Sequence, residues 1–103
     1  MKDLGKLVKQ AQQVQERLAE MQARLAEKTV EAASGGGMVK VVMNGRHEVV
    51  SLTIDSEVVN PADTEMLEDL VMAALNEARA RVDEMVRSEM ASLTGGLPIP
   101  GLF

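Results

Sequence analysis

The chain has 103 residues, a formal net charge of −5, no cysteine and a single aromatic residue, Phe103. This length suits one domain, and the absence of cysteine excludes disulfides, thiolate metal sites and a cysteine nucleophile. Because aromatic side chains are nearly absent, a single-strand or RNA-loop binder that stacks bases on aromatic rings is disfavoured. The sequence contains no run of about 18 apolar residues and no apolar signal segment, so we expect neither a membrane span nor a cleaved signal.

The first predicted element is a helix over residues 2–28. Its apolar residues follow one another at alternating steps of three and four, which is the heptad pattern of a coiled coil. This apolar stripe comprises Leu4, Leu7, Ala11, Val14, Leu18, Met21 and Leu25. We expect the stripe to pack on another helix.

A second stripe on the same helix is basic. Lys2, Lys6 and Lys9 are spaced by four and three residues, so they share one face near the free end, and Gln13 and Arg17 continue it. Residues 1–28 carry six basic and four acidic side chains, whereas residues 60–103 carry three basic and eight acidic ones. The chain is therefore not uniformly repulsive to DNA. This basic stripe is the candidate contact, and an ordinary solvated face is the alternative interpretation.

The centre of the chain predicts a small antiparallel sheet of three strands. Residues 29–33 give a weak strand pattern and residues 38–43 a clear one, separated by a run of three glycines at 35–37. Asn44-Gly45 favours a two-residue type I′ hairpin, in which both residues have positive φ. That loop would place Met43 opposite Arg46, Val41 opposite Glu48 and Val39 opposite Val50. The expected core face then comprises Val39, Val41, Val50, Leu52 and Ile54.

A second helix is predicted over residues 63–93, because Asn60-Pro61 breaks the chain and Asp63 can act as its N-cap. Its apolar face is wide enough to contact both the sheet and another helix. This face comprises Leu67, Leu70, Val71, Ala74, Leu75, Ala78, Val82, Met85, Val86 and Met90. Two prolines exclude a helix further on, so residues 95–103 are expected to form an extended tail after a single domain of residues 1–94.

The expected fold class is α+β, with two long helices that a three-stranded sheet cannot shield. The far ends of the helices should project as arms, each about 40 Å long. If the helices pack antiparallel, Lys2–Lys9 lies near Met85–Leu93. A second copy, joined through the sheet or the helix bases, would cover the exposed surfaces and strand edges. We therefore expect a homodimer.

Catalysis has few candidate groups. His47 is the only histidine, and it lies at the hairpin end without a nucleophile and orienting partner at recognisable spacing. The glycine run leads into a strand and lacks the Lys-Ser/Thr of a phosphate-binding loop. Glu65, Glu68 and Asp69 complement the helix dipole and do not form an oxygen cage for a cation. We expect no enzymatic activity, no metal, no cofactor and no small-molecule substrate.

Several segments carry a family resemblance. They are Lys9-Gln10-Ala11-Gln12-Gln13, Gly37-Met38-Val39-Lys40-Val41, Asn44-Gly45, Ile54-Asp55, Met66-Leu67-Glu68-Asp69-Leu70-Val71, Asn76-Glu77-Ala78 and the Gly-Gly-Leu-Pro-Ile-Pro-Gly-Leu-Phe ending. In this order, over nearly the whole chain, they resemble the YbaB/EbfC family of small bacterial nucleoid-associated proteins. The resemblance implies a tweezer-shaped homodimer that binds double-stranded DNA and alters its conformation. It also implies a cytoplasmic, nucleoid-associated role in nucleoid organisation or gene regulation.

The resemblance places the DNA-binding surface on the protruding helices. Lys9, Gln10 and Gln13 match the family's motif positions, and charge alone adds Lys2, Lys6, Arg17 and Arg87. The competing hypothesis is a non-enzymatic coiled-coil protein that holds unfolded clients, as prefoldin does. In that case Met85, Met90 and Leu93 would form an exposed apolar patch at the arm tip.

Overall fold

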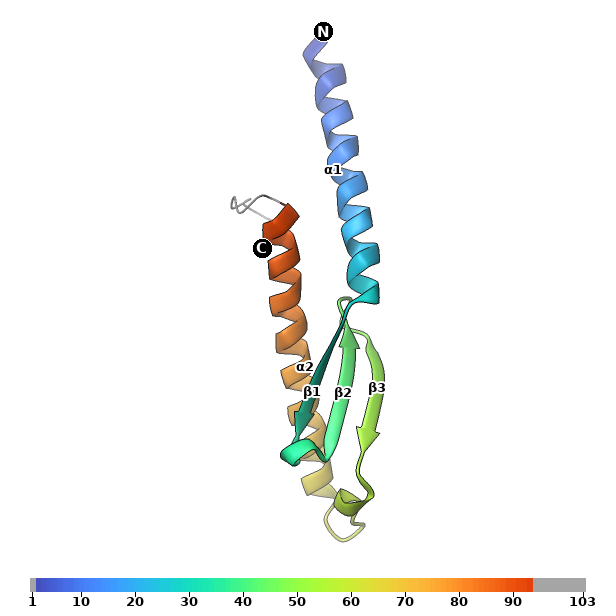
Figure 1. Ribbon diagram of the computed structural model, residues 1–103, viewed down its shortest axis with the longest axis vertical. Helices are drawn as coiled ribbons and strands as arrows, with labels where there is room; N and C mark the ends of the chain where they lie inside the picture. Colours follow the sequence, from blue (N-terminus) through green and yellow to red (C-terminus); the bar gives the residue numbers. More distant parts are fainter. Residues whose placement is uncertain (1, 94–103) are drawn as a thin grey trace.

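The computed structural model describes residues 2–93, apart from the side chains of Lys2 and Leu93. The expected tail at residues 95–103, and with it the expected domain boundary, lies outside this range. The elements are α1 (Lys2–Glu27), β1 (Thr29–Ser34), β2 (Val39–Asn44), β3 (Val49–Ile54) and α2 (Thr64–Leu93), with short 3₁₀ turns at Gly35–Gly37 and Ser56–Val58 (Figure 1). The predicted α+β class, with two long helices and a three-stranded antiparallel sheet, is confirmed.

Helix α2 forms the core with the sheet, whose strand order is β1-β2-β3. The helix packs along β1 and β2, where its Ala74, Ala78 and Val82 are completely buried in one cluster with Val39 and Val41. Alanines on the packed face let the helix backbone approach the strands closely. The predicted apolar face of α2 is therefore confirmed.

Specific hydrogen bonds fix the start of α2 and its contact with β1. The Asp63 carboxylate accepts a hydrogen bond from the backbone N–H of Met66 (3.2 Å), which confirms Asp63 as the N-cap. The Ser34 hydroxyl, at the end of β1, donates to the carbonyl oxygen of Leu70 (2.6 Å). The following turn, Gly35–Gly37, has positive φ at all three residues, a conformation that glycine adopts without steric cost.

The hairpin between β2 and β3 differs from the prediction. Val39 lies opposite Ile54 and Val41 opposite Leu52, with a β-bulge beside Met43. Neither loop residue expected to have positive φ does so; instead His47 has φ 62°. The connection is a three-residue loop whose last residue is left-handed, which is the next most common hairpin class after the two-residue turns. The type I′ prediction and the strand register derived from it are wrong.

The side chain of Asn44 explains the longer loop. Its Oδ1 accepts hydrogen bonds from the backbone N–H groups of Arg46 (2.9 Å) and Glu48 (3.1 Å). Its Nδ2 donates to the Glu48 carboxylate at 2.9 Å. Asparagine side chains commonly bond to the backbone two or more residues ahead, and here these bonds stabilise a wider turn than the Asn-Gly pair suggests.

Gly45 is required by packing and not by its φ angle. Its backbone N–H donates to the carbonyl oxygens of Leu25 (2.8 Å) and Lys28 (3.1 Å), which joins the hairpin to the end of α1. A Cβ atom at this position would lie 2.4 Å from the Leu25 carbonyl oxygen. A residue with a side chain cannot occupy this position without moving the backbone of α1 or of the hairpin.

Strand β3 lies outside the core of the single chain. Directly opposed residues share a face of the sheet, so Leu52 and Ile54 lie on the same side as Val41 and Val39. Because α2 packs on the other two strands, Leu52 and Ile54 remain 46% and 36% exposed, and Val50 is 58% exposed. The predicted core face is correct on β2 and wrong on β3 within the single chain.

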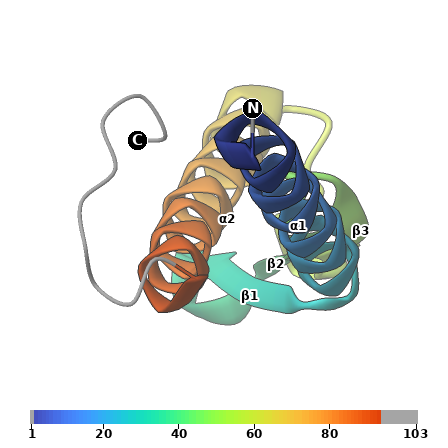
Figure 2. The same ribbon diagram turned by 90° about the horizontal axis from the view of Figure 1, so that it is seen from above.

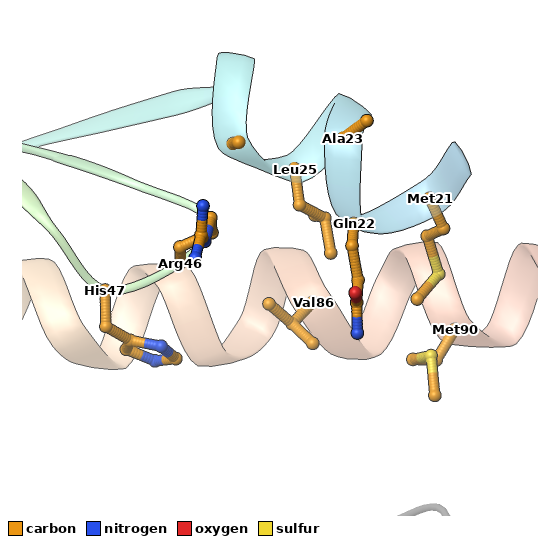
Figure 3. Close-up of a pocket in the computed structure, with 10 residues that line it drawn as sticks. Met21, Gln22, Ala23, Leu25, Arg46, His47, Val86 and Met90 are labelled. Atoms are coloured by element: carbon orange, nitrogen blue, oxygen red, sulfur yellow. The ribbon is translucent and has the colours of Figure 1, made fainter. Parts of the chain in front are cut away.

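Helix α1 continues past the end of α2 and makes the molecule 73 Å long. Seen along this axis, the two helices and the strands lie around a common centre (Figure 2). Met21 and Leu25 point toward α2, where they line a hollow together with Val86 and Met90 (Figure 3). The predicted proximity of Lys2–Lys9 to Met85–Leu93 is therefore wrong. The first half of α2 covers the sheet, so its second half covers α1 only as far as Leu18.

Candidate nucleic-acid interface

The part of α1 beyond α2 is exposed around its whole circumference. We call residues 3–17 the distal arm, and every one of them is exposed. Leu18 is half-buried, and Met21 and Leu25 are only 4% and 5% exposed, which marks where α2 begins to cover the helix. At a rise of 1.5 Å per residue, Lys9 lies about 18 Å beyond Met21. Ligands can therefore approach the distal arm from any side of this chain.

The basic stripe lies along this arm. Lys6, Lys9, Gln13 and Arg17 are exposed, and the continuous helix keeps them on one face, as the sequence predicts. None of the ion pairs between the side chains described in the structure engages the two lysines or the arginine. Their charges are therefore available to an anion in solution. Lys2 belongs to the same helix, but its side chain is outside the described part.

The remaining predicted contacts lie apart from this stripe. Gln10 is exposed at its border, between the basic and apolar stripes of the same helix. Arg87 lies on α2, below the distal arm, and its guanidinium is 3.5 Å from the carboxylate of Glu84. The structure does not bring Arg87 into the basic stripe, and its charge is partly neutralised by this neighbour.

The acidic start of α2 lies at the opposite end of the molecule. Asp63, Glu65, Glu68 and Asp69 are all exposed there. In Figure 1 this end of α2 lies beside the far end of the sheet, whereas the N-terminus of α1 lies at the other extreme. The separation of acidic and basic groups expected from the sequence is therefore confirmed. A polyanion that approaches the distal arm does not meet the acidic cluster.

Two side-chain contacts join the elements at the junction from which the arm projects. The ammonium group of Lys28 pairs with the carboxylate of Glu89, and His47 Nε2 lies 2.7 Å from Asp83 Oδ1. The hydrogen bond from Lys28, together with the charges of Lys28 and Arg24, holds the pKa of Glu89 below its usual value of 4.5 although desolvation acts in the opposite direction. Sequence reasoning missed both pairs, since their members are 61 and 36 residues apart and no local pattern links them.

The described residues contain no group of three or more His, Cys, Asp or Glu side chains that could hold a metal ion. Within the same range, no helix combines the length and the apolar character that crossing a membrane requires.

The fold and the arm define a small α+β protein that presents a long helix with a basic stripe from a sheet-and-helix body. The chain belongs to the YbaB/EbfC DNA-binding family, whose model matches residues 1–97. It is 56% identical over 101 residues to a nucleoid-associated protein of Thermoanaerobacter pseudethanolicus, covering 98% of this chain and 91% of the relative. A nucleoid-associated protein of Rhodospirillum rubrum is 48% identical over 97% of this chain and 94% of its own length.

A solved structure shares the fold. The crystal structure of an uncharacterized protein from Helicobacter pylori matches with a TM-score of 0.77 and 26% sequence identity. The match covers 85% of this chain and 92% of that one.

Proposed function

We propose that this chain binds double-stranded DNA as a homodimer and alters the conformation of the duplex, and so contributes to nucleoid organisation or gene regulation. The observation that carries this proposal is the distal arm, where Lys6, Lys9 and Arg17 are exposed and take part in none of the described ion pairs. Membership of a DNA-binding family supports it independently. The site of action would be the bacterial nucleoid, in the cytoplasm.

Phosphate contacts would supply most of the affinity. Ammonium and guanidinium groups release counterions from DNA when they neutralise phosphates, and such contacts position a protein on the duplex without reading its sequence. In this proposal Lys2, Lys6, Lys9 and Arg17 make these contacts. Gln10 and Gln13 add hydrogen bonds, and Arg87 contributes less because Glu84 lies beside it.

The uncovered part of the sheet supports the homodimer. Leu52 and Ile54 extend the buried face of β2 onto β3, where α2 does not cover them. A second copy packed on this face would bury apolar surface that the single chain leaves in water. Two-fold symmetry would then present the basic stripe twice, on two arms held by one rigid body, which is the arrangement needed to bend or bridge a duplex.

Gel retardation of a DNA duplex of random sequence tests the proposal. The double variant Lys6→Glu/Lys9→Glu should lose retardation at protein concentrations that fully shift the duplex with the unmodified chain. The matched control is Lys40→Glu/Arg79→Glu, which reverses two exposed charges on the body of the molecule. The control should still retard the duplex. If Lys6→Glu/Lys9→Glu retards the duplex as strongly as the control does, the basic stripe is not part of the interface.

The alternative function, holding unfolded clients, needs an exposed apolar surface on an arm. The patch that the sequence suggested for it is not free, because Met85 and Met90 are half-buried and Leu93 has no described side chain. Exposed apolar residues lie instead on α1, at Leu4 and Leu7. Suppression of the aggregation of a denatured client, without salt-sensitive retardation of DNA, would favour this function.

A further inference from the structure

Only one end of the apolar stripe of α1 is buried within the chain. Its last members, Met21 and Leu25, are buried beside α2, whereas Leu4 and Leu7 are each 61% exposed and Val14 is 56% exposed. The heptad spacing is nevertheless the same along the whole helix. This spacing is the pattern that packs one helix against another, and nothing in residues 2–93 of this chain covers the distal arm.

We propose that the distal arm pairs with the distal arm of a second copy as an antiparallel two-stranded coiled coil. In this register Leu4 lies opposite the partner's Val14, and Leu7 lies opposite the partner's Ala11. The two-fold axis generates the same two layers again in reverse. Each layer places a leucine against a smaller residue, which is the combination that fills an interface between closely packed helices.

The residues that flank these layers support the same register. On one side the carboxylate of Asp3 lies opposite the guanidinium of the partner's Arg17, and symmetry forms this ion pair twice. Between the two pairs, Gln10 lies opposite the partner's Gln10. On the other side Val8, which is 52% exposed and falls outside the strict heptad, lies opposite the partner's Val8. Flanking charges of this kind set the partner and the orientation of coiled coils.

A parallel pairing of the same helices lacks these matches. It would place Asp3 beside the partner's Val8 and Arg17 beside the partner's Gln22, so neither charge would meet an opposite one. It would also leave Leu7 facing the partner's Leu7 and Ala11 facing the partner's Ala11, which alternates crowded and underfilled layers. Charge and volume therefore both select the antiparallel orientation.

The inference goes beyond the proposed function, because the pairing needs only α1 and no DNA. Lys6, Lys9 and Gln13 lie on the outer side of such a pair and remain open to phosphates, whereas Arg17 would be shared between the two surfaces. Two heptads associate weakly by themselves. A homodimer carries two arms, so successive dimers would be linked at both ends, and the combined affinity of two arms would exceed that of one.

Cysteine cross-linking without DNA tests the register, since the chain has no cysteine of its own. Three single variants are compared under the same oxidant: Val8→Cys at the two-fold axis, Ala11→Cys inside the layers and Gln12→Cys on the outer side. Covalent dimers should form with Val8→Cys at least about tenfold faster than with either of the other two. Equal rates for Val8→Cys and Gln12→Cys would overturn the pairing, and fastest cross-linking by Ala11→Cys would overturn the antiparallel register.

A charge exchange provides a second readout that does not depend on a new thiol. Sedimentation velocity in the absence of DNA should show weaker association for Asp3→Arg and for Arg17→Asp, and recovery in the double variant that carries both changes. The control Gln12→Arg adds a charge on the outer side and should associate as the unmodified chain does. If the double variant associates as weakly as the two single variants, the Asp3–Arg17 pairing is contradicted. If the unmodified chain binds denatured clients but shows no association through its arms, the proposal is also contradicted.

Discussion

Gly45 is the residue at which the arm is fixed to the body. Its N–H group donates to the carbonyl oxygens of Leu25, in the last turn of α1, and of Lys28, just after the helix. The hairpin backbone lies too close to Leu25 for any side chain at this position. The orientation of the whole arm therefore depends on contacts within a few residues of Gly45. A small displacement here would move the tip of α1 by a much larger distance.

Replacing Gly45 with alanine tests this role. The new Cβ atom would lie 2.4 Å from a backbone oxygen, so Gly45→Ala should lower the free energy of unfolding by about 1–3 kcal/mol, as overpacking typically does. Gly5→Ala is the matched control, since a Cβ atom at that position would meet nothing within 4 Å and alanine is favoured in helices. Urea denaturation measures both. Equal stability of the two variants would show that the close contact at Gly45 does not exist.

The Lys28–Glu89 pair predicts a pH dependence. Because the pKa of Glu89 is lower in the folded chain, the pair stabilises the fold above the usual value of 4.5, and the contribution is lost as pH falls through the lowered pKa. Thermal unfolding of Glu89→Gln should therefore occur at a lower Tm than that of the unmodified chain at pH 7. The difference should disappear in acid. A difference in Tm that is the same at pH 7 and at pH 3 would contradict the ion pair.

At the scale of the element, one regular helix serves two purposes along its length. The apolar stripe of α1 keeps one spacing, but its environment changes from buried to exposed at Leu18, where α2 ends. The spacing alone could predict that α1 has an apolar face. It could not predict which part of that face is covered, because this depends on how far α2 extends past the sheet.

The two ends of the apolar stripe should respond differently to truncation. Leu25→Ala removes a side chain that is 5% exposed and should cost about 2–5 kcal/mol of folding free energy, whereas Leu4→Ala, at an equivalent heptad position that is 61% exposed, should change it by less than about 0.5 kcal/mol. Denaturation at low protein concentration separates folding from association. Similar costs at both positions would mean that the tip of α1 is buried in the folded single chain.

Other elements show how far local patterns determine a fold. The α2 face, the Asp63 cap and the three strands follow from periodicity and from residues with strong local preferences, and the structure has all of them. The hairpin register does not follow, because the Asn44 side chain and the left-handed His47 outweigh the Asn-Gly preference. The exposure of β3 could not be predicted either, since it depends on which strands α2 covers.

At the scale of the whole molecule, charge and apolar surface are distributed along a body 73 Å long. Basic groups lie toward the tip of α1, acidic groups lie at the start of α2, and an uncovered apolar sheet face lies on the body between them. The sequence predicts that the basic and acidic groups lie at opposite ends of the molecule, because this separation follows from the order of the elements. The Lys28–Glu89 and His47–Asp83 contacts at the base of the arm join residues far apart in the chain, so no sequence pattern indicates them.

The proposed dimer can be tested on the uncovered sheet face. Leu52→Asp places a carboxylate in the expected interface. At protein concentrations too low for two arms to pair by themselves, light scattering should show the mass of a single chain in place of that of a dimer. Ser51→Asp adds the same charge to the adjacent residue, whose side chain points to the other side of the strand, and should leave the dimer intact. A dimeric mass for both variants would place the interface elsewhere on the molecule.

The salt dependence of DNA binding tests most directly whether the basic stripe drives binding through phosphates. Four cations on each of two arms would give a slope of log K against log salt concentration of about −7 if all of them engage. Replacing Lys6 and Lys9 with glutamine removes four of these charges from a dimer and should make the slope shallower by about 3 to 4. A slope near zero for the unmodified chain, or the same slope for both proteins, would contradict the account.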